Sequence, residues 1–175
     1  MASSLKQIVI VTGGSRGIGA ATAQLAAAQG YAVCVNYRHH EAAARAVVDA
    51  ITQAGDGAMV GDRPRAIAVA ADVASESDVV RLFETVDEQL GPVTALVNNA
   101  GILEQQRRVA DLDGARLSRV LATNVVGSIL CAREAIRRMS TQRGGGGGAI
   151  VNVSSVAARL GAPGEYVDYA VSKGA

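Results

Sequence analysis

The chain has 175 residues, of which 49% are hydrophobic and 3% aromatic, and its 17 basic and 16 acidic residues leave a formal net charge of +1. A chain so close to neutral has no bulk attraction for nucleic acid or membranes, and so few aromatic residues argue against a base-stacking surface. The N-terminus has no secretory pattern, and no apolar segment is as long as a membrane span. Cys34 and Cys131 lie in apolar segments without metal-ligand spacing, so we expect buried thiols, no metal site and a cytoplasmic protein.

Strand and helix patterns alternate through the first half of the chain. In order they are a strand at Ile8–Val11, a helix at about Gly17–Gln29, a strand at Tyr31–Asn36, a helix at Glu41–Ala54, a loop at Gly55–Arg65 and a strand at Ala66–Ala71. Gly30 is expected to end the first helix, because glycine readily adopts the left-handed conformation found after helix C-termini.

The same alternation continues through the second half. In order it contains a helix from a Ser75 cap to about Leu90, a strand at Ala95–Val97, a long helix at Gly114–Met139, a glycine connector at Gly144–Gly148, a strand at Ala149–Val153 and the start of a helix near Tyr166–Asp168. Strands alternating with helices form right-handed crossovers. The sequence therefore predicts one domain over residues 1–175. Its fold class is α/β, a Rossmann-like doubly wound parallel sheet with five strands in the order 3-2-1-4-5 between two helix layers.

A glycine-rich turn, Thr12–Gly19, joins the first strand to the first helix. Backbone N–H groups at a helix start attract a phosphate, and glycine lets the phosphate approach the backbone. An ordinary strand-to-helix turn is the alternative interpretation. However, ligands of such sheets bind beyond the carboxyl ends of the strands, and Asn98–Gly101 and Ser154-Ser155 follow the fourth and fifth strands. This convergence of three strand ends predicts a nucleotide site.

Tyr169 and Lys173 are four residues apart on a predicted helix, so their side chains share one face. A phenol is a poor acid–base catalyst at pH 7 unless its anion is stabilised by roughly 4 kcal/mol. One ammonium about 4 Å away contributes about that much at an effective dielectric constant near 20. The alternative is a packed tyrosine beside a solvated lysine.

Asn124 falls on the face of the long helix that we expect to be buried. The positions that mark this face are Leu117, Val120, Leu121, Val125, Ser128 and Cys131. A buried amide is costly unless it has hydrogen-bond partners. Asn124 is therefore either capped by neighbouring backbone or held there for a function.

Taken together, these motifs resemble the short-chain dehydrogenase/reductase family, in its short single-domain branch. The residues that carry the resemblance are Thr12–Gly19, Asp72-Val73, Asn98–Gly101, Asn124, Ser154-Ser155 and Tyr169–Lys173. The resemblance implies reversible hydride transfer between a nicotinamide cofactor and a small-molecule carbonyl or secondary alcohol. It implies that the catalytic residues are Asn124, Ser155, Tyr169 and Lys173, with Ser154 as the alternative serine. It further implies a cofactor site made of Gly13, Ser15, Arg16, Gly17, Ile18, Gly19, Asn36, Tyr37, Arg38, Asp72, Val73, Asn99, Ala100, Gly101, Tyr169 and Lys173.

In the family's mechanism, the serine orients the substrate oxygen and the tyrosine exchanges its proton. The lysine stabilises the tyrosine anion and holds the nicotinamide ribose, while Asn124 would hold a water in a proton relay. Asp72 resembles the residue that contacts the adenine ring.

The end of the second strand indicates which nicotinamide cofactor is bound. An acidic residue there would bind a ribose 2′-hydroxyl and repel a 2′-phosphate. This strand ends in Asn36-Tyr37-Arg38, without a carboxylate. Arg38 can pair with a 2′-phosphate, and Arg16 in the glycine-rich turn offers a second cation. The sequence therefore favours NADP(H) over NAD(H).

The family continues beyond the Tyr-Lys helix, so the resemblance suggests a chain without the C-terminal substrate-binding segment, and an exposed fifth strand. The alternative function is then a catalytically inactive dinucleotide-binding protein or subunit. An epimerase or dehydratase of the extended relatives is disfavoured by the glycine spacing. A full-length protein would be a homodimer or homotetramer, with the long helix and the Tyr-Lys helix at its interfaces. The identity of the substrate does not follow from the sequence.

Overall fold

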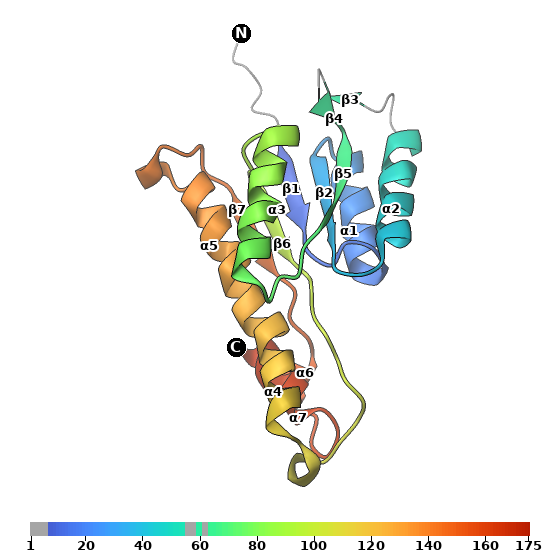
Figure 1. The fold of residues 1–175 in the computed structure, drawn as a ribbon, viewed down its shortest axis with the longest axis vertical. Coiled ribbons are helices and arrows are strands. Elements are labelled where there is room, and N and C mark those ends of the chain that lie inside the picture. Colours follow the sequence, from blue (N-terminus) through green and yellow to red (C-terminus); the bar gives the residue numbers. More distant parts are fainter. Residues whose placement is uncertain (1–6, 55–58, 61–62) are drawn as a thin grey trace.

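The structure is a computed structural model that describes residues 7–54, 59–60 and 63–175. At its centre is a parallel five-stranded sheet in the order β5-β2-β1-β6-β7 (Figure 1). Its strands are β1 (Ile8–Val11), β2 (Ala32–Tyr37), β5 (Ala66–Ala70), β6 (Ala95–Asn98) and β7 (Ala149–Asn152). This order confirms the predicted order 3-2-1-4-5, and the strands begin and end within one residue of their predicted limits.

Two helices cover each face of the sheet. Helices α1 (Gly17–Ala28) and α2 (Glu41–Ala54) pack on one face, and α3 (Glu76–Gln89) and α5 (Gly127–Met139) pack on the other. Successive residues of a strand point to opposite faces, so Val9 and Val11 join the first core while Ile8 and Ile10 join the second. Because both faces are covered, β1 reads as a continuous apolar run. The predicted Rossmann-like architecture is thus confirmed.

Two local features differ from the predictions, and one agrees with them. Part of the predicted loop at Gly55–Arg65 forms a small antiparallel ribbon of β3 (Met59–Val60) and β4 (Arg63–Pro64), and the rest of that loop before Arg63 lies outside the described residues. A short helix, α6 (Ala157–Leu160), follows β7, in a segment where the sequence predicted no helix. Ser75 does cap α3 as predicted, since its Oγ accepts a hydrogen bond from the backbone N–H of Asp78.

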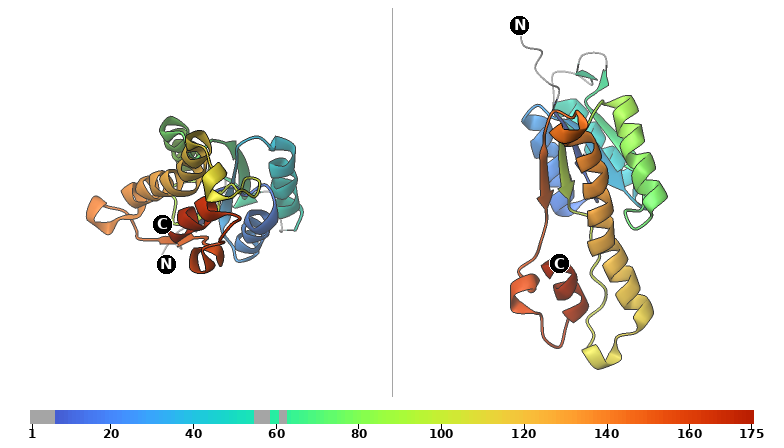
Figure 2. Two further views of the ribbon diagram at one scale, coloured as in Figure 1. Left: turned by 90° about the horizontal axis from the view of Figure 1, so that it is seen from below. Right: turned by 90° about the vertical axis from the view of Figure 1, so that its left-hand side faces the viewer.

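The long helix predicted at Gly114–Met139 is interrupted. It consists of α4 (Gly114–Leu121), a π-helical turn at Ala122–Val126, and α5. The predicted buried face is wrong at two positions, because Leu117 and Leu121 are 37% and 39% exposed. The π-helical turn changes the helical register, and α4 extends past the carboxyl end of the sheet, as Figures 1 and 2 show.

Beyond the sheet, α4 packs against α7 (Val167–Gly174), the predicted Tyr-Lys helix. The buried residues of α4 are Arg116, which contacts Asp168 of α7, and Val120. Asn124 is buried as predicted, at 6% exposure. The cysteines Cys34 and Cys131 are buried as well, and burial raises the pKa of the Cys131 thiol to about 12. Within the described part of the chain, no helix combines the length and the apolarity needed to cross a bilayer.

A cluster of charges joins α3 and α5. The buried carboxylate of Glu134 accepts hydrogen bonds from Arg133, Arg137 and Arg138, and Arg138 also pairs with Asp87 on α3 at 2.6 Å. Burial raises the pKa of Glu134. The hydrogen bond from Arg138 and the charges of Arg137 and Arg138 together lower this pKa by more than burial raises it. The pKa therefore lies below its ordinary value of 4.5.

This pKa predicts how stability depends on pH. A carboxylate whose pKa is lowered by folding stabilises the protein above its unfolded pKa, and the stabilisation is lost as the pH falls through the folded value. We expect Glu134→Gln to lower the free energy of unfolding at pH 7 by roughly 1–2 kcal/mol, and to differ less from the parent chain at pH 3, below the ordinary carboxyl pKa of 4.5. Urea unfolding at both pH values measures this. The exposed Glu84→Gln is the control, and an undiminished gap at pH 3 would contradict the assignment.

Candidate active site

A cavity of about 380 Å³ opens at the carboxyl ends of β1, β2, β5 and β6. Thirteen of the residues predicted to bind the cofactor line it: Gly13, Ser15, Arg16, Ile18, Gly19, Asn36, Tyr37, Arg38, Asp72, Val73, Asn99, Ala100 and Gly101. The other lining residues, which the sequence argument missed, are His39, His40, Ala71, Ile102 and Thr123. Gly17, Tyr169 and Lys173 are not among the residues that line it.

The glycine-rich turn closes one wall of the cavity. Gly17 has a φ of +55°, in the left-handed region that favours glycine. At Gly19 the reason for glycine is space, because an added Cβ would lie 2.5 Å from both the Asn99 Nδ2 and the Gly13 carbonyl oxygen. The turn therefore lies directly against the end of β6.

Asn99 and Thr12 hold these two strand ends together. The Asn99 Nδ2 donates to the carbonyl oxygens of Thr12 and Gly13 at 2.9 and 3.1 Å. In return, the Thr12 Oγ1 accepts from the backbone N–H groups of Asn99 and Ala100, both at 3.0 Å. The side chain of Asn99 thus sets the shape of the turn.

Asn36 performs a similar task at the end of β2. Its Oδ1 accepts from the backbone N–H of Gly13 at 3.2 Å, while its Nδ2 donates to the carbonyl oxygens of Val69 and Ala71 at 3.3 and 3.0 Å. The residue is 2% exposed. Although Asn36 lines the cavity, these hydrogen bonds show that its amide links β1, β2 and β5.

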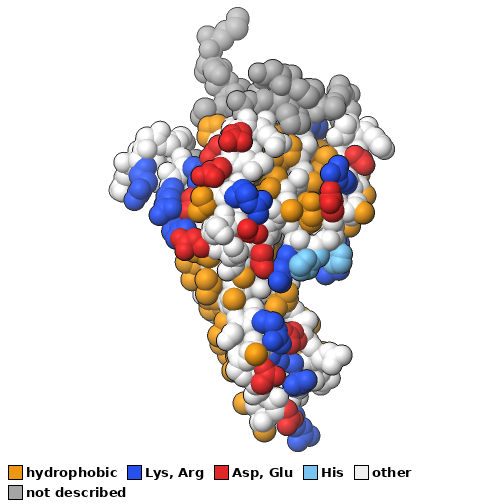
Figure 3. Space-filling view, in the orientation of Figure 1, with side chains coloured by type: hydrophobic (Ala, Val, Ile, Leu, Met, Phe, Trp, Pro, Cys, Tyr) orange, Lys and Arg blue, Asp and Glu red, His pale blue; other side chains and the backbone are white. Residues whose placement is uncertain are grey.

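The rim of the cavity is basic. Arg38 Nε pairs with Asp72 Oδ2 at 3.0 Å, and Arg16 Nη1 lies 3.4 Å from His40 Nε2. Among the described residues that line the cavity, Asp72 is the one carboxylate, against two arginines and two histidines. Figure 3 shows the two histidines (pale blue) with basic side chains beside them. In the sequence, the two histidines could have been found from the basic run Arg38-His39-His40 directly after β2.

Asn124 and Lys173 lie next to Gly101, one of the residues that line the cavity. A Cβ built on Gly101, which lines the cavity, would lie 3.4 Å from both the Asn124 Oδ1 and the Lys173 Nζ. The structure therefore brings the loop after β6, the π-helical turn and α7 together next to the cavity. Lys173 is the link between the cavity and α7.

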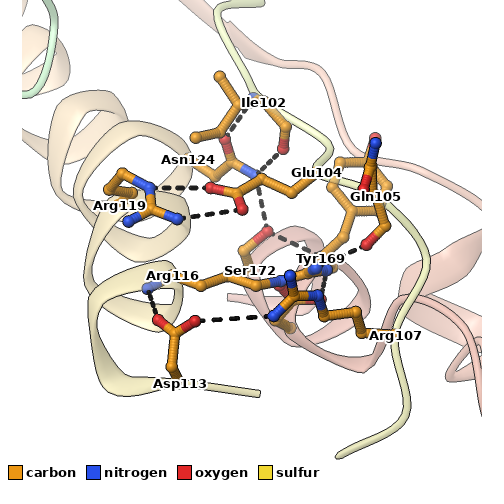
Figure 4. Close-up of polar contacts among 11 residues, drawn as sticks. Ile102, Glu104, Gln105, Arg107, Asp113, Arg116, Arg119, Asn124, Tyr169 and Ser172 are labelled. Carbon is orange, nitrogen blue, oxygen red and sulfur yellow. Dashed lines mark hydrogen bonds and ion pairs between the residues drawn. The ribbon is translucent and has the colours of Figure 1, made fainter. Parts of the chain in front are cut away.

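The amide of Asn124 is fully used by its neighbours (Figure 4). Its Oδ1 accepts from the backbone N–H of Ile102 at 2.8 Å, and its Nδ2 donates to the Ile102 carbonyl and to the Ser172 Oγ at 3.0 and 2.9 Å. Of the two interpretations of Asn124 given by the sequence, these contacts correspond to an amide that is capped by its neighbours. A role for Asn124 in a proton relay stays a prediction.

Tyr169 and Lys173 lie near each other on α7. The Lys173 Nζ is 6.0 Å from the centre of the Tyr169 ring and donates to the Val153 carbonyl at 2.7 Å. Burial lowers the pKa of Lys173 below its ordinary value of 10.5. A lysine held between a strand end and a half-buried phenol is suited to stabilise a phenolate.

Both candidate serines use their hydroxyl groups locally. The Ser154 Oγ donates to the Lys173 carbonyl at 2.8 Å, and the Ser155 Oγ accepts from the backbone N–H of Ala157 at 3.2 Å, in the first turn of α6. The assignment of Ser155 rather than Ser154 therefore stays a prediction.

The described residues contain no group of three or more His, Cys, Asp or Glu side chains that is placed to hold a metal ion. Apart from the Asp72 carboxylate and a few hydroxyl groups, the polar groups around the cavity are backbone N–H groups, amides and cations. Groups of this kind recognise anionic and hydroxyl-bearing ligands.

Comparison with known proteins identifies the family. The family model described as short chain dehydrogenase matches residues 7–175. The chain is 56% identical over 168 residues to an uncharacterized oxidoreductase, YgfF, of Escherichia coli, with 96% of this chain and 65% of that protein covered. It is 41% identical over 170 residues to human 3-oxoacyl-(acyl-carrier-protein) reductase, with 97% and 65% covered.

A third relative is named for its cofactor. The chain is 37% identical over 173 residues to a chloroplastic NADPH-dependent aldehyde reductase 2 of Arabidopsis thaliana, with 97% of this chain and 62% of that protein covered. The chain thus spans less than two thirds of the length of each of these relatives. The match over residues 7–175 shows that the chain belongs to the short chain dehydrogenase family.

Proposed function

We propose that this chain is an NADP-dependent oxidoreductase that interconverts a carbonyl compound and a secondary alcohol. The observation that carries the proposal is the contact at Gly101, where the wall of the cavity meets Lys173 and Asn124. The proposed dinucleotide site is thereby next to Lys173, one of the two proposed acid–base residues on α7. The alternative, an inactive dinucleotide-binding protein, would not require this arrangement.

The residues present fit a nicotinamide dinucleotide. The closely packed glycines leave backbone exposed to a pyrophosphate, and the first turn of α1 lies beside them. For the 2′-phosphate of NADP, the rim offers Arg38 and Arg16. The pair with Asp72 uses the Arg38 Nε, and a guanidinium has four further N–H donors. The Arabidopsis relative is named for its dependence on NADPH, which also supports this cofactor.

Each catalytic residue then has one task. When bound, the nicotinamide ring supplies or accepts the hydride. Ser155, or Ser154 in its place, holds the substrate oxygen, and Tyr169 donates or removes the proton at that oxygen. Lys173 stabilises the anion of Tyr169 and binds the nicotinamide ribose, and Asn124 supports the path by which the proton reaches solvent.

The test is oxidation of NADPH by the purified chain with a panel of aldehydes, ketones and sugars. Calorimetric titration with NADP and NAD runs in parallel. Turnover with one substrate class supports the proposal, whereas NADP binding without any turnover would favour the inactive binding protein. Failure to bind either dinucleotide would overturn both.

Gly19 offers a structural test of the cofactor site. An added methyl group at Gly19 would lie 2.5 Å from the Asn99 Nδ2 and the Gly13 carbonyl, so the turn must shift. We expect Gly19→Ala to weaken binding of NADP and NAD alike, by roughly tenfold. Gly114→Ala is the matched control, because a Cβ there meets nothing within 4 Å. Unchanged affinity in Gly19→Ala would contradict a site at this turn.

We further propose that residues 1–175 act as one cytoplasmic domain that assembles into a homodimer or homotetramer. An apolar surface on α4 and α5 supports assembly, since Leu117, Leu121, Ile129 and Ile136 are all exposed, as is Val171 on α7. Apolar side chains (orange) run along this edge in Figure 3. Exposed apolar surfaces of this kind mark protein interfaces. Light scattering on the purified chain measures its mass, and a monomer at all concentrations would exclude the assembly.

A further inference from the structure

A buried ion pair links α4 to α7, apart from the residues that line the cofactor cavity. The Arg116 Nε lies 2.7 Å from the Asp168 Oδ2, and the Arg116 Nη2 lies 3.2 Å from the Asp168 Oδ1. Each side chain is 2% exposed. Burying two charges costs more than burying apolar groups of the same size, unless their geometry is good. Such a pair therefore calls for an explanation beyond stability.

Arg116 is also attached to two other segments (Figure 4). Its Nη1 donates to the carbonyl oxygen of Gln105 at 2.5 Å, and its backbone N–H donates to the Asp113 Oδ1 at 2.7 Å. The guanidinium thus connects α4 to the loop after β6 and to the start of α7. Few other side chains have enough N–H donors for this task.

The position of the pair determines how α7 is rotated about its axis. Asp168 and Ser172 are four residues apart, are both buried, and contact Arg116 and Asn124 respectively. Tyr169 and Lys173 each follow one residue later, so their side chains are turned by about 100° from those anchors. Two anchors one turn apart fix the direction in which Tyr169 and Lys173 point.

Arg116 also balances the negative charge of Asp168. Asp168 directly precedes Tyr169, and an unbalanced carboxylate beside the tyrosine would oppose loss of the phenolic proton. The hydrogen bond from Arg116 lowers the pKa of Asp168 against the effect of burial, and backbone N–H groups at Tyr169 and Asp168 lower it further. The carboxylate is thus ionised but balanced by a cation at 2.7 Å.

We infer that Arg116 and Asp168 are positioning residues for Tyr169, a role that rests on the proposed function. They hold the rotation of α7, and Arg116 cancels the charge that Asp168 would otherwise leave unbalanced one residue before Tyr169. Neither residue lines the cavity at the strand ends. Both act through α7, the helix that carries Tyr169 and Lys173.

The test is a direct titration of Tyr169, which needs no turnover. The chain has no Trp and four Tyr residues, so the absorbance of tyrosinate near 295 nm is free of indole. Subtracting the curve of a matching Tyr169→Phe protein isolates the ionisation of Tyr169. The measurement is made on the parent chain, Arg116→Met, Asp168→Asn and the double variant, after circular dichroism has shown that each is folded.

The two single variants are expected to move the midpoint in opposite directions. Arg116→Met leaves an unbalanced carboxylate and raises the midpoint by about half to one pH unit, whereas Asp168→Asn leaves an unbalanced cation and lowers it by a similar amount. The double variant returns toward the parent. If Arg116→Met does not fold, the comparison of Asp168→Asn with the double variant still decides the sign.

Arg119→Met is the matched control. Arg119 lies one turn further along α4 and forms a similar two-bond pair with Glu104, at 3.0 and 3.1 Å, but its side chain is 56% exposed. Arg119→Met should leave the midpoint unchanged. Shifts in the same direction for both single variants would reveal general loosening and overturn the inference. A parent chain without turnover would instead refute the proposed function, while the titration would still decide the role of the pair.

Discussion

Replacing Tyr169 with phenylalanine is expected to lower turnover with NADPH by about 10²–10⁴-fold, while the affinity for NADPH changes by less than about threefold. The variant removes one hydroxyl group and keeps the ring that packs on α7. It thus removes the group proposed to exchange a proton with the substrate oxygen. Because Tyr169 is not among the residues that line the cavity at the strand ends, most of the proposed cofactor-binding surface is untouched.

Steady-state rates and calorimetric titration separate the two effects. Tyr166→Phe is the control, since Tyr166 is the half-buried residue immediately before α7 and differs from Tyr169 in having no proposed part in the reaction. The control should retain the parent rate. A Tyr169→Phe protein with parental turnover would show that the proton comes from another group, and the proposed mechanism would be wrong.

The second large effect concerns the choice of cofactor. We expect Arg38→Asp to weaken NADP binding by about 10²-fold and to leave NAD binding within about threefold of the parent value. The substitution removes a cation from the rim of the cavity and places a carboxylate at the end of β2. A carboxylate at that position repels a 2′-phosphate and can accept a hydrogen bond from a 2′-hydroxyl.

Dissociation constants for both dinucleotides, measured at one ionic strength, test this selectivity. Arg143→Asp changes the net charge equally, but Arg143 lies after α5 and is not among the residues that line this cavity. Its effect on either cofactor should be small. An equal loss for NADP and NAD in Arg38→Asp would contradict the proposed 2′-phosphate site, because a general disturbance of the cavity would then be the cause.

Sequence patterns were sufficient to predict the features that depend on residues close together in the chain. The apolar run before Thr12–Gly19 predicted a buried strand that leads into a tight turn, and both are present. The alternation of strands and helices predicted the order of the sheet, because parallel strands need crossovers of one hand. That order in turn placed Gly13, Asn99 and Gly101 in one cavity.

Patterns failed where burial depends on a distant segment. The periodicity of the long helix placed Leu117 and Leu121 inside, but they are exposed, because a π-helical turn intervenes and the sheet does not reach α4. Arg116 looks like an ordinary surface residue in the sequence, yet it is 2% exposed since Asp168 and the Gln105 carbonyl surround its guanidinium. No local signal records a partner 52 residues away.

The sequence alone therefore determined the family resemblance, the sheet order and the residue types of the proposed dinucleotide site, since each depends on spacing within one element or at one strand end. The tertiary structure alone decided how those residues are used. It showed that Asn36 and Asn124 bond to backbone, that Arg38 is paired with Asp72, and that Arg116 meets Asp168. The physical reason is that hydrogen bonds and ion pairs require contact in space, and contact between remote segments exists only after the chain has folded.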